Sequence, residues 1–314
     1  MNLKTNVPLK DFSNFRIGGP AEYFFQAHTM EELGEAMRLS ERLNFFILGG
    51  GTNVLIDDKG FDGLVIYNKI GGIKLDGTDL TVGSGVLVSD VLDFCIRNSL
   101  SGLEWAGGLP GTIGGAVRGN AGAFKGEIKD SVTQVQSLNL SPRGEAGKTQ
   151  NQMLRNNSEC NFAYRSSVFK SEEGKGEFIT SVMLRLRLGV KVEIQRKIAE
   201  KIDYRNAKHP MNYPNIGSTF KNIPLDSLSE KLQKEFEPFI KTDPFPVVPT
   251  TKLLALAGLK GRRIGGAMIS DKHPNFIVNV DNAKAQDVQA LIKIAKDAIY
   301  QKYGISLEEE IIYL

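Results

Sequence analysis

The chain is poor in the residues that build disulfide frameworks and metal centres. Its 314 residues include only two cysteines and three histidines. Cys95 and Cys160 stand in unrelated surroundings, which suits a reducing, cytoplasmic compartment and argues against a disulfide framework. His28, His209 and His273 are far apart in sequence and show no metal-ligand spacing, so we predict no metal site.

An excess of charge of one sign and long apolar runs are also missing. Lys and Arg number 39 against 36 Asp and Glu, a net charge of +3, which gives no electrostatic footprint for nucleic acid or an acidic membrane. No apolar run reaches the roughly 18 residues of a membrane span, and the segment from Met1 to Arg16 has no apolar stretch typical of a secretory leader. We therefore expect a cytoplasmic globular protein without a nucleic-acid, membrane or obligate protein partner.

Glycine is present in excess. There are 33 glycines in 314 residues, more than the average of about 7%. No Gly-X-Y repeat or flexible linker accounts for them, and they concentrate in a few clusters. The length allows roughly two domains of about 150 residues each. The glycine clusters are therefore where the chemistry of the chain is expected.

The residues around the first cluster predict a small α/β unit. A helix at 29–43 begins with the Thr-x-x-Glu spacing of a capping box. A buried strand at 44–48 then runs into the glycines at 49–51, and strands at 54–56 and 64–67 follow.

Short strands and a few helices are predicted for the rest of the chain. Residues 71–188 read as short strands and glycine turns with one helix near 89–98. Isoleucines every four residues predict an amphipathic helix at 192–207. The remaining predicted elements are helices at 251–257 and 285–303, each ended by a glycine, and a terminal strand at 307–314.

The first cluster is the loop Gly49-Gly50-Gly51-Thr52-Asn53. It is not a dinucleotide fingerprint, because Val54 stands where the last glycine belongs and a strand follows instead of a helix. It also lacks the Gly-Lys-Ser/Thr end of a P-loop. A loop of this composition between strands can present consecutive backbone N–H groups as an anion nest. A tight hairpin turn is the alternative, but three glycines exceed what a hairpin needs.

The second cluster spans 107–116 and continues at 120–123. It has almost no bulky side chains, which lets the backbone approach a flat or phosphorylated ligand closely. An irregular loop packed against a sheet is the alternative. Because two such loops lie about 60 residues apart in the chain, we favour one dinucleotide held by both.

Seven motifs, in the same order along the chain, resemble those of the UDP-N-acetylenolpyruvoylglucosamine reductase family. These are flavoenzymes that complete UDP-N-acetylmuramate for peptidoglycan synthesis. The resemblance covers nearly the whole chain. The matching segments are Phe15–Ala21, Gly49–Leu55, Pro110–Ala116 with Asn120–Ala123, Tyr164–Lys170, Gly217–Asn222, Gly258–Gly261 with Arg263–Ala267, and Leu307–Glu310. The last of these resembles a Leu-Glu-Pro-Glu segment, with Glu309 in place of the proline.

The resemblance implies an α+β fold in three parts. A two-part FAD-binding region of the vanillyl-alcohol-oxidase (PCMH) type would comprise residues 1–68, and 69–208 together with 305–314. A C-terminal α+β substrate-binding domain would comprise 209–304. The short middle of the chain resembles the family's second type, which lacks an inserted substrate-covering loop.

The resemblance also implies the ligands. NADPH would be the co-substrate that reduces non-covalent FAD, and a UDP-sugar nucleotide bearing an enolpyruvyl group would then be reduced. Covalent flavin attachment is not expected, because the first loop contains no histidine. The implied FAD-binding residues are Gly49, Gly50, Gly51, Thr52 and Asn53 in the first loop, and Gly111, Thr112, Gly114, Gly115, Ala116, Asn120 and Ala121 in the second.

Three residues carry the implied chemistry. Arg165 would stabilise growing charge on the substrate carboxylate, because a guanidinium stays charged and can fork onto a carboxylate. Ser218 would donate the proton, and Glu310 would act with Arg165. Without the resemblance, Arg165 reads as a surface arginine, Ser218 as a turn-capping hydroxyl and Glu310 as part of an exposed acidic strand.

Substrate-contacting positions are implied at Tyr164, Lys208, Asn222 and His273. On the residues alone, Lys208 is equally a favourable charge at the end of a helix, and His273 an exposed turn residue before Pro274. His209 stands where the family usually has glutamine.

Two other functions stay open from the sequence. Another FAD-dependent oxidoreductase of the same fold, acting on a sugar or hydroxy acid, would explain both glycine loops but not the Ser218 and Glu310 motifs. A non-catalytic nucleotide-binding module would be expected to have lost Arg165, Ser218 or Glu310.

Overall fold

The structure is a computed structural model that describes residues 2–40, 43–139, 152–174 and 176–314. The chain forms two compact units, each built from several segments. The first unit comprises Met1–Val7, Ala21–Gly50 and Asp62–Asp203. The second comprises Pro8–Pro20, Gly51–Phe61 and Tyr204–Leu314. The three-part division with boundaries at 68 and 208 stays a prediction.

One sheet of the first unit has the strand order β1-β2-β5-β3. Its strands are β1 (Lys4–Pro8), β2 (Pro20–Ala27), β5 (Phe61–Asn68) and β3 (Phe45–Leu48). β3 and β5 run parallel, with Phe45 opposite Leu64 and Leu48 opposite Tyr67. Helix α1 (Met30–Ser40) buries Leu33 against Leu64 and Ile66 of this sheet. The parallel pairing brings the end of β3, and with it the first glycine cluster, to an edge of the sheet.

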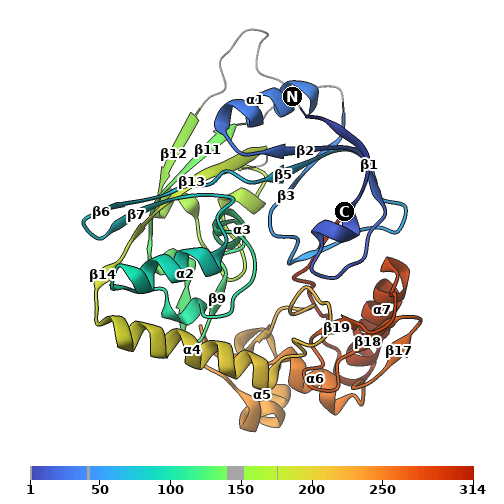
Figure 1. Cartoon of the computed structure of the whole chain (residues 1–314). Coiled ribbons are helices and arrows are strands. Elements are labelled where there is room, and N and C mark those ends of the chain that lie inside the picture. Colours follow the sequence, from blue (N-terminus) through green and yellow to red (C-terminus); the bar gives the residue numbers. More distant parts are fainter. Residues whose placement is uncertain (1, 41–42, 140–151, 175) are drawn as a thin grey trace. The chain divides into compact units, whose positions relative to one another are not determined.

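A second sheet of the first unit is antiparallel and has the order β12-β11-β13-β7-β6. Its apolar face packs on α2 and α3, as Figure 1 shows. Val82, Val135 and Val182 of the sheet share a core with Val91 of α2 and Val117 of α3. The elements are β12 (Gln152–Asn156), β11 (Val132–Asn139), β13 (Glu177–Arg185), β7 (Asp79–Gly83), β6 (Ile73–Asp76), α2 (Val88–Arg97) and α3 (Ile113–Arg118).

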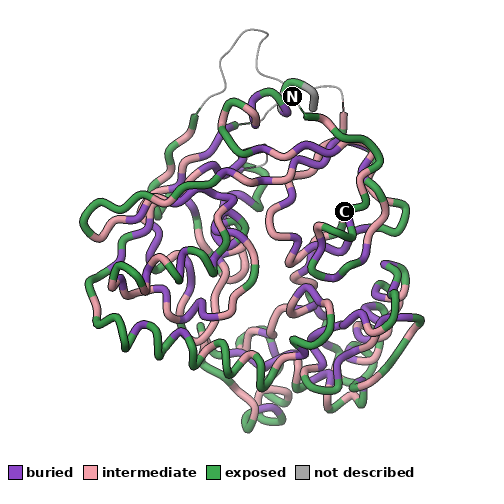
Figure 2. The backbone as a smooth tube through the Cα atoms, in the orientation of Figure 1, coloured by how far each residue is buried: buried purple, intermediate pink, exposed green. Residues whose placement is uncertain are grey.

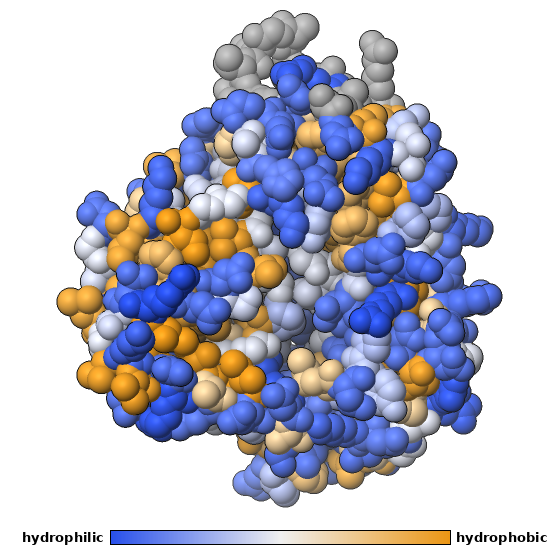
Figure 3. Space-filling view, in the orientation of Figure 1, coloured by the Kyte–Doolittle hydropathy of each residue, from blue (hydrophilic) through white to orange (hydrophobic). Residues whose placement is uncertain are grey.

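Short elements complete the first unit. Two antiparallel pairs are β8 (Leu100–Ser101) with β14 (Arg187–Leu188), and β9 (Gly122–Ala123) with β10 (Gly126–Glu127). Helix α4 (Lys191–Lys208) follows and buries Ile194 and Ile198 on an otherwise mostly exposed surface (Figure 2). Leu188, Val190 and Val192 are exposed, and Figure 3 shows hydrophobic side chains gathered over β14 and the start of α4.

The second unit packs around helix α7 (Ala285–Tyr303). Leu291, Ile292 and Ile299 of this helix share a core with Ile269 and Phe236. The sheet β17-β18-β19 consists of Arg263–Ile264, Ala267–Ile269 and Ile277–Asn279. The other elements are β4 (Val54–Leu55) parallel to β20 (Ile312–Tyr313), β15 (Ile223–Pro224) paired with β16 (Val247–Val248), α5 (Glu230–Phe236) and α6 (Thr250–Leu256).

Most predicted elements are present. Helix α7 ends at Gly304, whose φ of +69° is the left-handed conformation that glycine favours. At α1, the Thr29 hydroxyl accepts from the Glu32 N–H at 3.2 Å, as the capping spacing predicts. The described part of that helix ends at Ser40, and residues 41–42 of the predicted span lie outside the described residues. No helix within the described ranges is long and apolar enough to span a membrane.

Three features differ from the sequence prediction. The end of the second glycine cluster, from residue 113, forms helix α3 rather than a loop, because tertiary hydrogen bonds outweigh the poor helix propensity of glycine. The terminal strand is confined to Ile312–Tyr313, and before it only Glu309 forms an antiparallel bridge, to Phe220. Ile202, predicted on the apolar face of α4, is 39% exposed.

Candidate active site

The turn at Gly51 requires a glycine. Its φ is +63°, and a Cβ at this position would lie 1.9 Å from the Phe12 carbonyl oxygen. The Gly51 carbonyl in turn accepts from the Asn14 N–H at 3.0 Å. The backbone at Gly51 is therefore held against the segment at 12–14, which also belongs to the second unit.

Consecutive donors of this loop have no acceptor in the described part of the protein. The N–H groups of Gly51, Thr52 and Asn53 make no hydrogen bond to the described residues, although Gly51 is buried and the other two are partly buried. A buried N–H without a partner is unfavourable unless a ligand or water satisfies it. Such a row suits an anionic group, so the loop fits the phosphates of a dinucleotide such as FAD and supports the anion nest over the hairpin turn.

The two glycine clusters meet at Gly49 and Thr112, both in the first unit. A Cβ on Gly49 would lie 2.9 Å from the Thr112 Oγ1. That oxygen also caps α3 by accepting from the Gly115 N–H at 3.3 Å. The close approach leaves no room for a side chain at position 49, so glycine is needed there.

The backbone N–H groups at the start of α3 are already hydrogen-bonded to other parts of the protein. The Ile113 N–H donates to the Val86 carbonyl and the Gly114 N–H to the Ser84 carbonyl, each at 2.9 Å. A Cβ on Gly114 would lie 2.9 Å from the Ser84 Cβ. Gly115, by contrast, is exposed. The second cluster therefore offers an open, small-residue surface for a flat ligand rather than a second row of free N–H groups.

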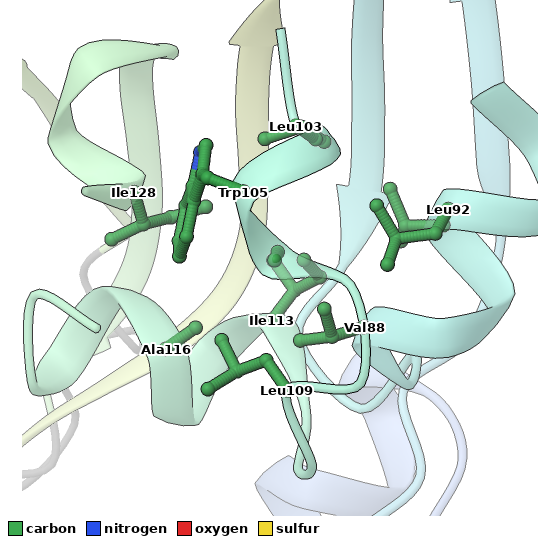
Figure 4. A pocket seen from close by; sticks show the side chains of 10 residues that line it. Val88, Leu92, Leu103, Trp105, Leu109, Ile113, Ala116 and Ile128 are labelled. Atoms are coloured by element: carbon green, nitrogen blue, oxygen red, sulfur yellow. The ribbon is translucent and has the colours of Figure 1, made fainter. Parts of the chain in front are cut away.

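The floor beneath α3 is an apolar crevice, shown in Figure 4. Val88 and Leu92 of α2 line it together with Leu109, Ile113 and Ala116, which lie in or next to α3. Leu103, Trp105 and Ile128 complete the view. The apolar side chains around the crevice pack against α3 and hold it in place. None of the residues that line the crevice is charged, so it offers no group for catalysis.

Asn120 ties the second cluster to the turn that carries Arg165. Its Nδ2 donates to the Ala163 carbonyl at 2.9 Å and to Glu127 Oε1 at 3.1 Å. Its Oδ1 accepts from the Lys129 N–H at 3.4 Å. The carboxamide of this fully buried residue is therefore engaged within the protein, which makes its role toward a cofactor one of shaping the loop.

Arg165 occupies an unfavourable backbone conformation. Ala163 and Ser166 exchange backbone hydrogen bonds of 3.0 and 3.1 Å around a two-residue turn, and Arg165 has a φ of +54°. This region favours glycine, and strained residues of this kind gather at functional sites. The guanidinium donates from Nη2 to the Gly122 carbonyl at 2.9 Å and lies 5.1 Å from the centre of the Tyr164 ring. The charge is thus held beside the second glycine cluster.

In the second unit, Asn275 holds the segment that follows Ser218. Its backbone carbonyl accepts from the Thr219 N–H at 2.7 Å. Its buried side chain accepts from the Phe220 N–H at 3.0 Å and donates to the Phe220 carbonyl at 2.8 Å. These bonds fix the segment next to Ser218, which itself forms an isolated antiparallel bridge with Phe276.

The hydroxyl of Ser218 does not cap the preceding turn. Asn215 does so instead, because its Oδ1 accepts from the Gly217 N–H at 3.0 Å. Ser218 Oγ makes no hydrogen bond to the residues that the structure describes, and the side chain is partly buried. A partly buried hydroxyl without a partner is available to a substrate.

Glu310 lies on the segment next to Ser218. Its N–H donates to the Thr219 carbonyl at 2.9 Å. Its own carbonyl accepts from Asn53 Nδ2 at 3.0 Å. The second unit thus joins three predicted site segments, the end of the first glycine loop, the Ser218 motif and the terminal acidic segment.

His273 lies in an aromatic cluster beside Ser218. Its ring centre is 5.2 Å from that of His209 and 4.8 Å from that of Phe276. Burial lowers the pKa of both histidines to about 4, so both rings are neutral at pH 7. His209 and Phe276 are not among the predicted site residues. Phe276 lies in the same turn as His273, whereas only the tertiary fold brings His209 to it.

The other predicted substrate residues have simpler surroundings. Lys208 is exposed in the last turn of α4, as expected of a cation at a helix end. Asn222 Oδ1 accepts from the Thr250 N–H at 3.2 Å, at the start of α6. Arg165 and Tyr164 belong to the first unit and Ser218 and Glu310 to the second. Within the described ranges no group of three or more His, Cys, Asp or Glu could hold a metal ion.

Comparison with known proteins covers both units. Residues 209–314 match the family model described as the C-terminal domain of UDP-N-acetylenolpyruvoylglucosamine reductase, and residues 21–149 match an FAD-binding domain. These matches confirm the predicted α+β fold class, with an FAD-binding region followed by a C-terminal domain.

Full-length relatives carry the same family name. UDP-N-acetylenolpyruvoylglucosamine reductase of Caldicellulosiruptor bescii is 37% identical, over 98% of this chain and 89% of the relative. That of Carboxydothermus hydrogenoformans is 36% identical, over 98% and 92%.

A solved structure shares the fold over its whole length. The crystal structure of UDP-N-acetylenolpyruvylglucosamine reductase from Thermus caldophilus superposes with a TM-score of 0.76 at 30% identity, covering 100% of this chain and 99% of that one. The chain therefore belongs to the UDP-N-acetylenolpyruvoylglucosamine reductase family and is an FAD-dependent oxidoreductase.

Proposed function

We propose that this chain catalyses the NADPH-driven reduction of the enolpyruvyl group of UDP-N-acetylglucosamine enolpyruvate to give UDP-N-acetylmuramate for peptidoglycan synthesis. The observation that carries the proposal is the Ser218 hydroxyl, which has no partner among the described residues and lies next to Thr219, whose carbonyl accepts from the Glu310 N–H. We further propose that the enzyme works in the cytoplasm on small molecules, without an obligate protein partner.

The loops around the glycine clusters would hold FAD, which when bound supplies the two-electron redox chemistry of the reaction. The N–H groups of residues 51–53 would receive its phosphates, since they have no other acceptor among the described residues. Gly49, Gly50, Gly111, Thr112, Gly114 and Ala116 would shape the backbone around it, with Gly115 and Ala121 in contact and Asn120 supporting the loop from behind.

Reduction of the substrate adds a hydride and a proton across its vinyl double bond. The carbon next to the carboxylate becomes carbanion-like, and Ser218 Oγ would give its proton to that carbon. The carboxylate gains charge at the same moment, and Arg165 would bind it through its fixed guanidinium. Glu310 would act on the same carboxylate region as the partner of Arg165.

Four residues would bind and orient the sugar nucleotide. Tyr164 would present its aromatic ring, and His273 a neutral imidazole. Lys208 is exposed and suits the substrate phosphates as a mobile point charge. Asn222 would contact the substrate from the start of α6, where its carboxamide oxygen accepts from the Thr250 N–H.

The proposal is tested by following the visible spectrum of the purified protein without oxygen. NADPH should bleach the yellow flavin, and UDP-N-acetylglucosamine enolpyruvate should restore it, while UDP-N-acetylglucosamine lacking the enolpyruvyl group should not. Bleaching without recovery would favour another FAD-dependent oxidoreductase, acting on a sugar or hydroxy acid. A colourless protein that binds UDP-sugars would favour a nucleotide-binding module.

A further inference from the structure

Three adjacent glutamates, Glu308, Glu309 and Glu310, end in very different surroundings. The Glu308 side chain is 70% exposed and pairs with Lys221. The Glu309 side chain is only 18% exposed. A largely buried carboxylate is costly unless it is paired and hydrogen-bonded. The burial of Glu309 therefore requires partners for its carboxylate, whereas the exposed Glu308 is solvated by water.

Both oxygens of the Glu309 carboxylate are engaged, each by a different element of the second unit. Oε1 forms a salt bridge with Lys296 Nζ, which lies on α7. Oε2 accepts a hydrogen bond from the hydroxyl of Tyr313, which lies on β20. Partial burial of the ring and this hydrogen bond raise the pKa of Tyr313, so its hydroxyl stays a donor across the working pH range. One side chain thus fastens the terminal segment to two elements.

The backbone at Glu309 sets the register of the same segment. Glu309 and Phe220 form an antiparallel bridge. Around it, the Lys221 N–H donates to the Glu308 carbonyl and the Glu310 N–H to the Thr219 carbonyl, each at 2.9 Å. Side chains of an extended segment alternate between faces, and a slip of one residue would move each to the other face. Anchoring Glu309 toward α7 therefore places the Glu310 side chain on the opposite face.

We propose that Glu309 is a positioning residue, and that the Lys296–Glu309–Tyr313 clamp holds the register and orientation of Glu310. The inference rests on the proposed catalytic role of Glu310. It assigns a purpose to a carboxylate that does not itself touch substrate, and it predicts that the clamp affects only the step in which Glu310 takes part.

The test measures the two half-reactions separately by stopped flow in five variants of the full chain, Glu310→Gln among them. Glu309→Ala and Tyr313→Phe should slow flavin reoxidation by the enolpyruvyl substrate, by about 10- to 100-fold for the first, because small misplacements of a reacting group have effects of this size. Flavin reduction by NADPH should stay within 2-fold of the wild type, on the order of measurement scatter. Glu309→Gln, which keeps an acceptor oxygen, should recover part of the loss. Glu308→Ala is the matched control, removing a neighbouring carboxylate, and should change neither step.

Four outcomes would bear on the proposal. If Glu309→Ala and Tyr313→Phe slow both half-reactions equally and lower the flavin content, the clamp has only a structural role and the proposal is wrong. If Glu309→Ala does not fold, Tyr313→Phe, which removes a single hydroxyl, decides alone. If Glu310→Gln slows reoxidation but the clamp variants do not, the positioning role is wrong while the proposed function stands. If Glu310→Gln itself leaves reoxidation unchanged, the proposed role of Glu310 is wrong.

Discussion

The side-chain amide of Asn53 donates to the backbone carbonyl of Glu310 at 3.0 Å, across 257 residues of sequence. This bond joins the end of the first glycine loop to the acidic terminal segment. Asn53, the last of the three predicted phosphate-binding donors, therefore also holds the backbone of a predicted catalytic residue.

Replacing Asn53 should consequently affect both flavin content and stability. Asn53→Ala leaves the Glu310 carbonyl without this donor and should cost about 1 kcal/mol. Asn53→Asp sets a carboxylate against that carbonyl and near the expected phosphates, so it should lower the flavin retained after gel filtration as well. The control is Asn98→Asp, whose wild-type amide makes an equivalent bond to the Phe94 carbonyl at 2.8 Å. It should leave flavin content unchanged, and equal flavin loss in both Asp variants would argue against a role for Asn53 in the site.

Ser218→Ala should separate the two half-reactions. The hydroxyl has no partner among the described residues, so its removal should leave the melting temperature nearly unchanged. Reduction of the flavin by NADPH should proceed normally, while reoxidation by the enolpyruvyl substrate should slow by about 10²–10⁴-fold, the range of general acid catalysis. Equal slowing of both steps would show that Ser218 is not the proton donor.

Arg165→Gly should lower activity while it relieves the backbone strain at this position. Glycine accepts the φ of +54° without strain, which is worth on the order of 1 kcal/mol and offsets the lost contacts with Gly122 and Tyr164. The melting temperature should therefore move by only a few degrees. Reoxidation by substrate should fall by about 10²–10³-fold, since a charge-stabilising donor is lost.

The matched control for Arg165 is Asn161→Gly. Asn161 also has a positive φ, of 45°, and it is exposed. This variant relaxes the backbone in the same way without removing a charge, and it should retain full activity. A comparable loss of activity in both variants would mean that backbone strain, not the guanidinium, matters.

Gly51→Ala should lower stability and flavin content far more than Gly77→Ala, although both glycines have a similar positive φ. At Gly51 the added Cβ would lie 1.9 Å from the Phe12 carbonyl oxygen, whereas at Gly77 it would meet nothing within 4 Å. The φ values are similar, +63° and +59°. Gly77→Ala should lose about 1 kcal/mol, and Gly51→Ala clearly more, with loss of flavin. Urea unfolding and the flavin absorbance of both variants measure the difference; equal losses would place the loop further from Phe12 than the structure does.

Acid should destabilise the protein through the His209–His273 pair. Burial holds the pKa of each at about 4, below the ordinary 6.5. Between these values the unfolded chain binds more protons than the folded one, so this contribution is complete above about pH 6.5 and is lost as the pH falls toward 4. His209→Gln should make the decline of stability between pH 6.5 and 4 shallower. His28→Gln, at an exposed position, should not, and an unchanged decline in the first variant would contradict the burial of the pair.

The success of the sequence prediction depended on local signals. Strand β3, the capped start of α1 and the glycine end of α7 follow from hydrophobic patterns and backbone preferences that act over a few residues. Helix α3 was missed because five glycines at 107–115 oppose a helix locally, and only Thr112 and the carbonyls of Ser84 and Val86 reveal what stabilises its start.

The candidate site shows the same limit. The motifs identified Arg165, Ser218 and Glu310, but Ser218 as a sequence position is equally a turn cap, and the structure removes that alternative by giving the cap to Asn215. His209 was not predicted, because its contact with His273 joins residues far apart in the chain. Phe276 was not predicted either, although its contact with His273 is local in sequence.

The sequence by itself determined the family and the flavin chemistry, and its motifs predict which side chains and glycines the site uses. Only the tertiary structure decided which donors stay free at residues 51–53, which carboxylate of the acidic triplet is anchored, and what holds Arg165 in its strained turn. Those properties are set by partners distant in the chain, and hydrogen bonding and burial depend on distances in space that the order of residues does not specify.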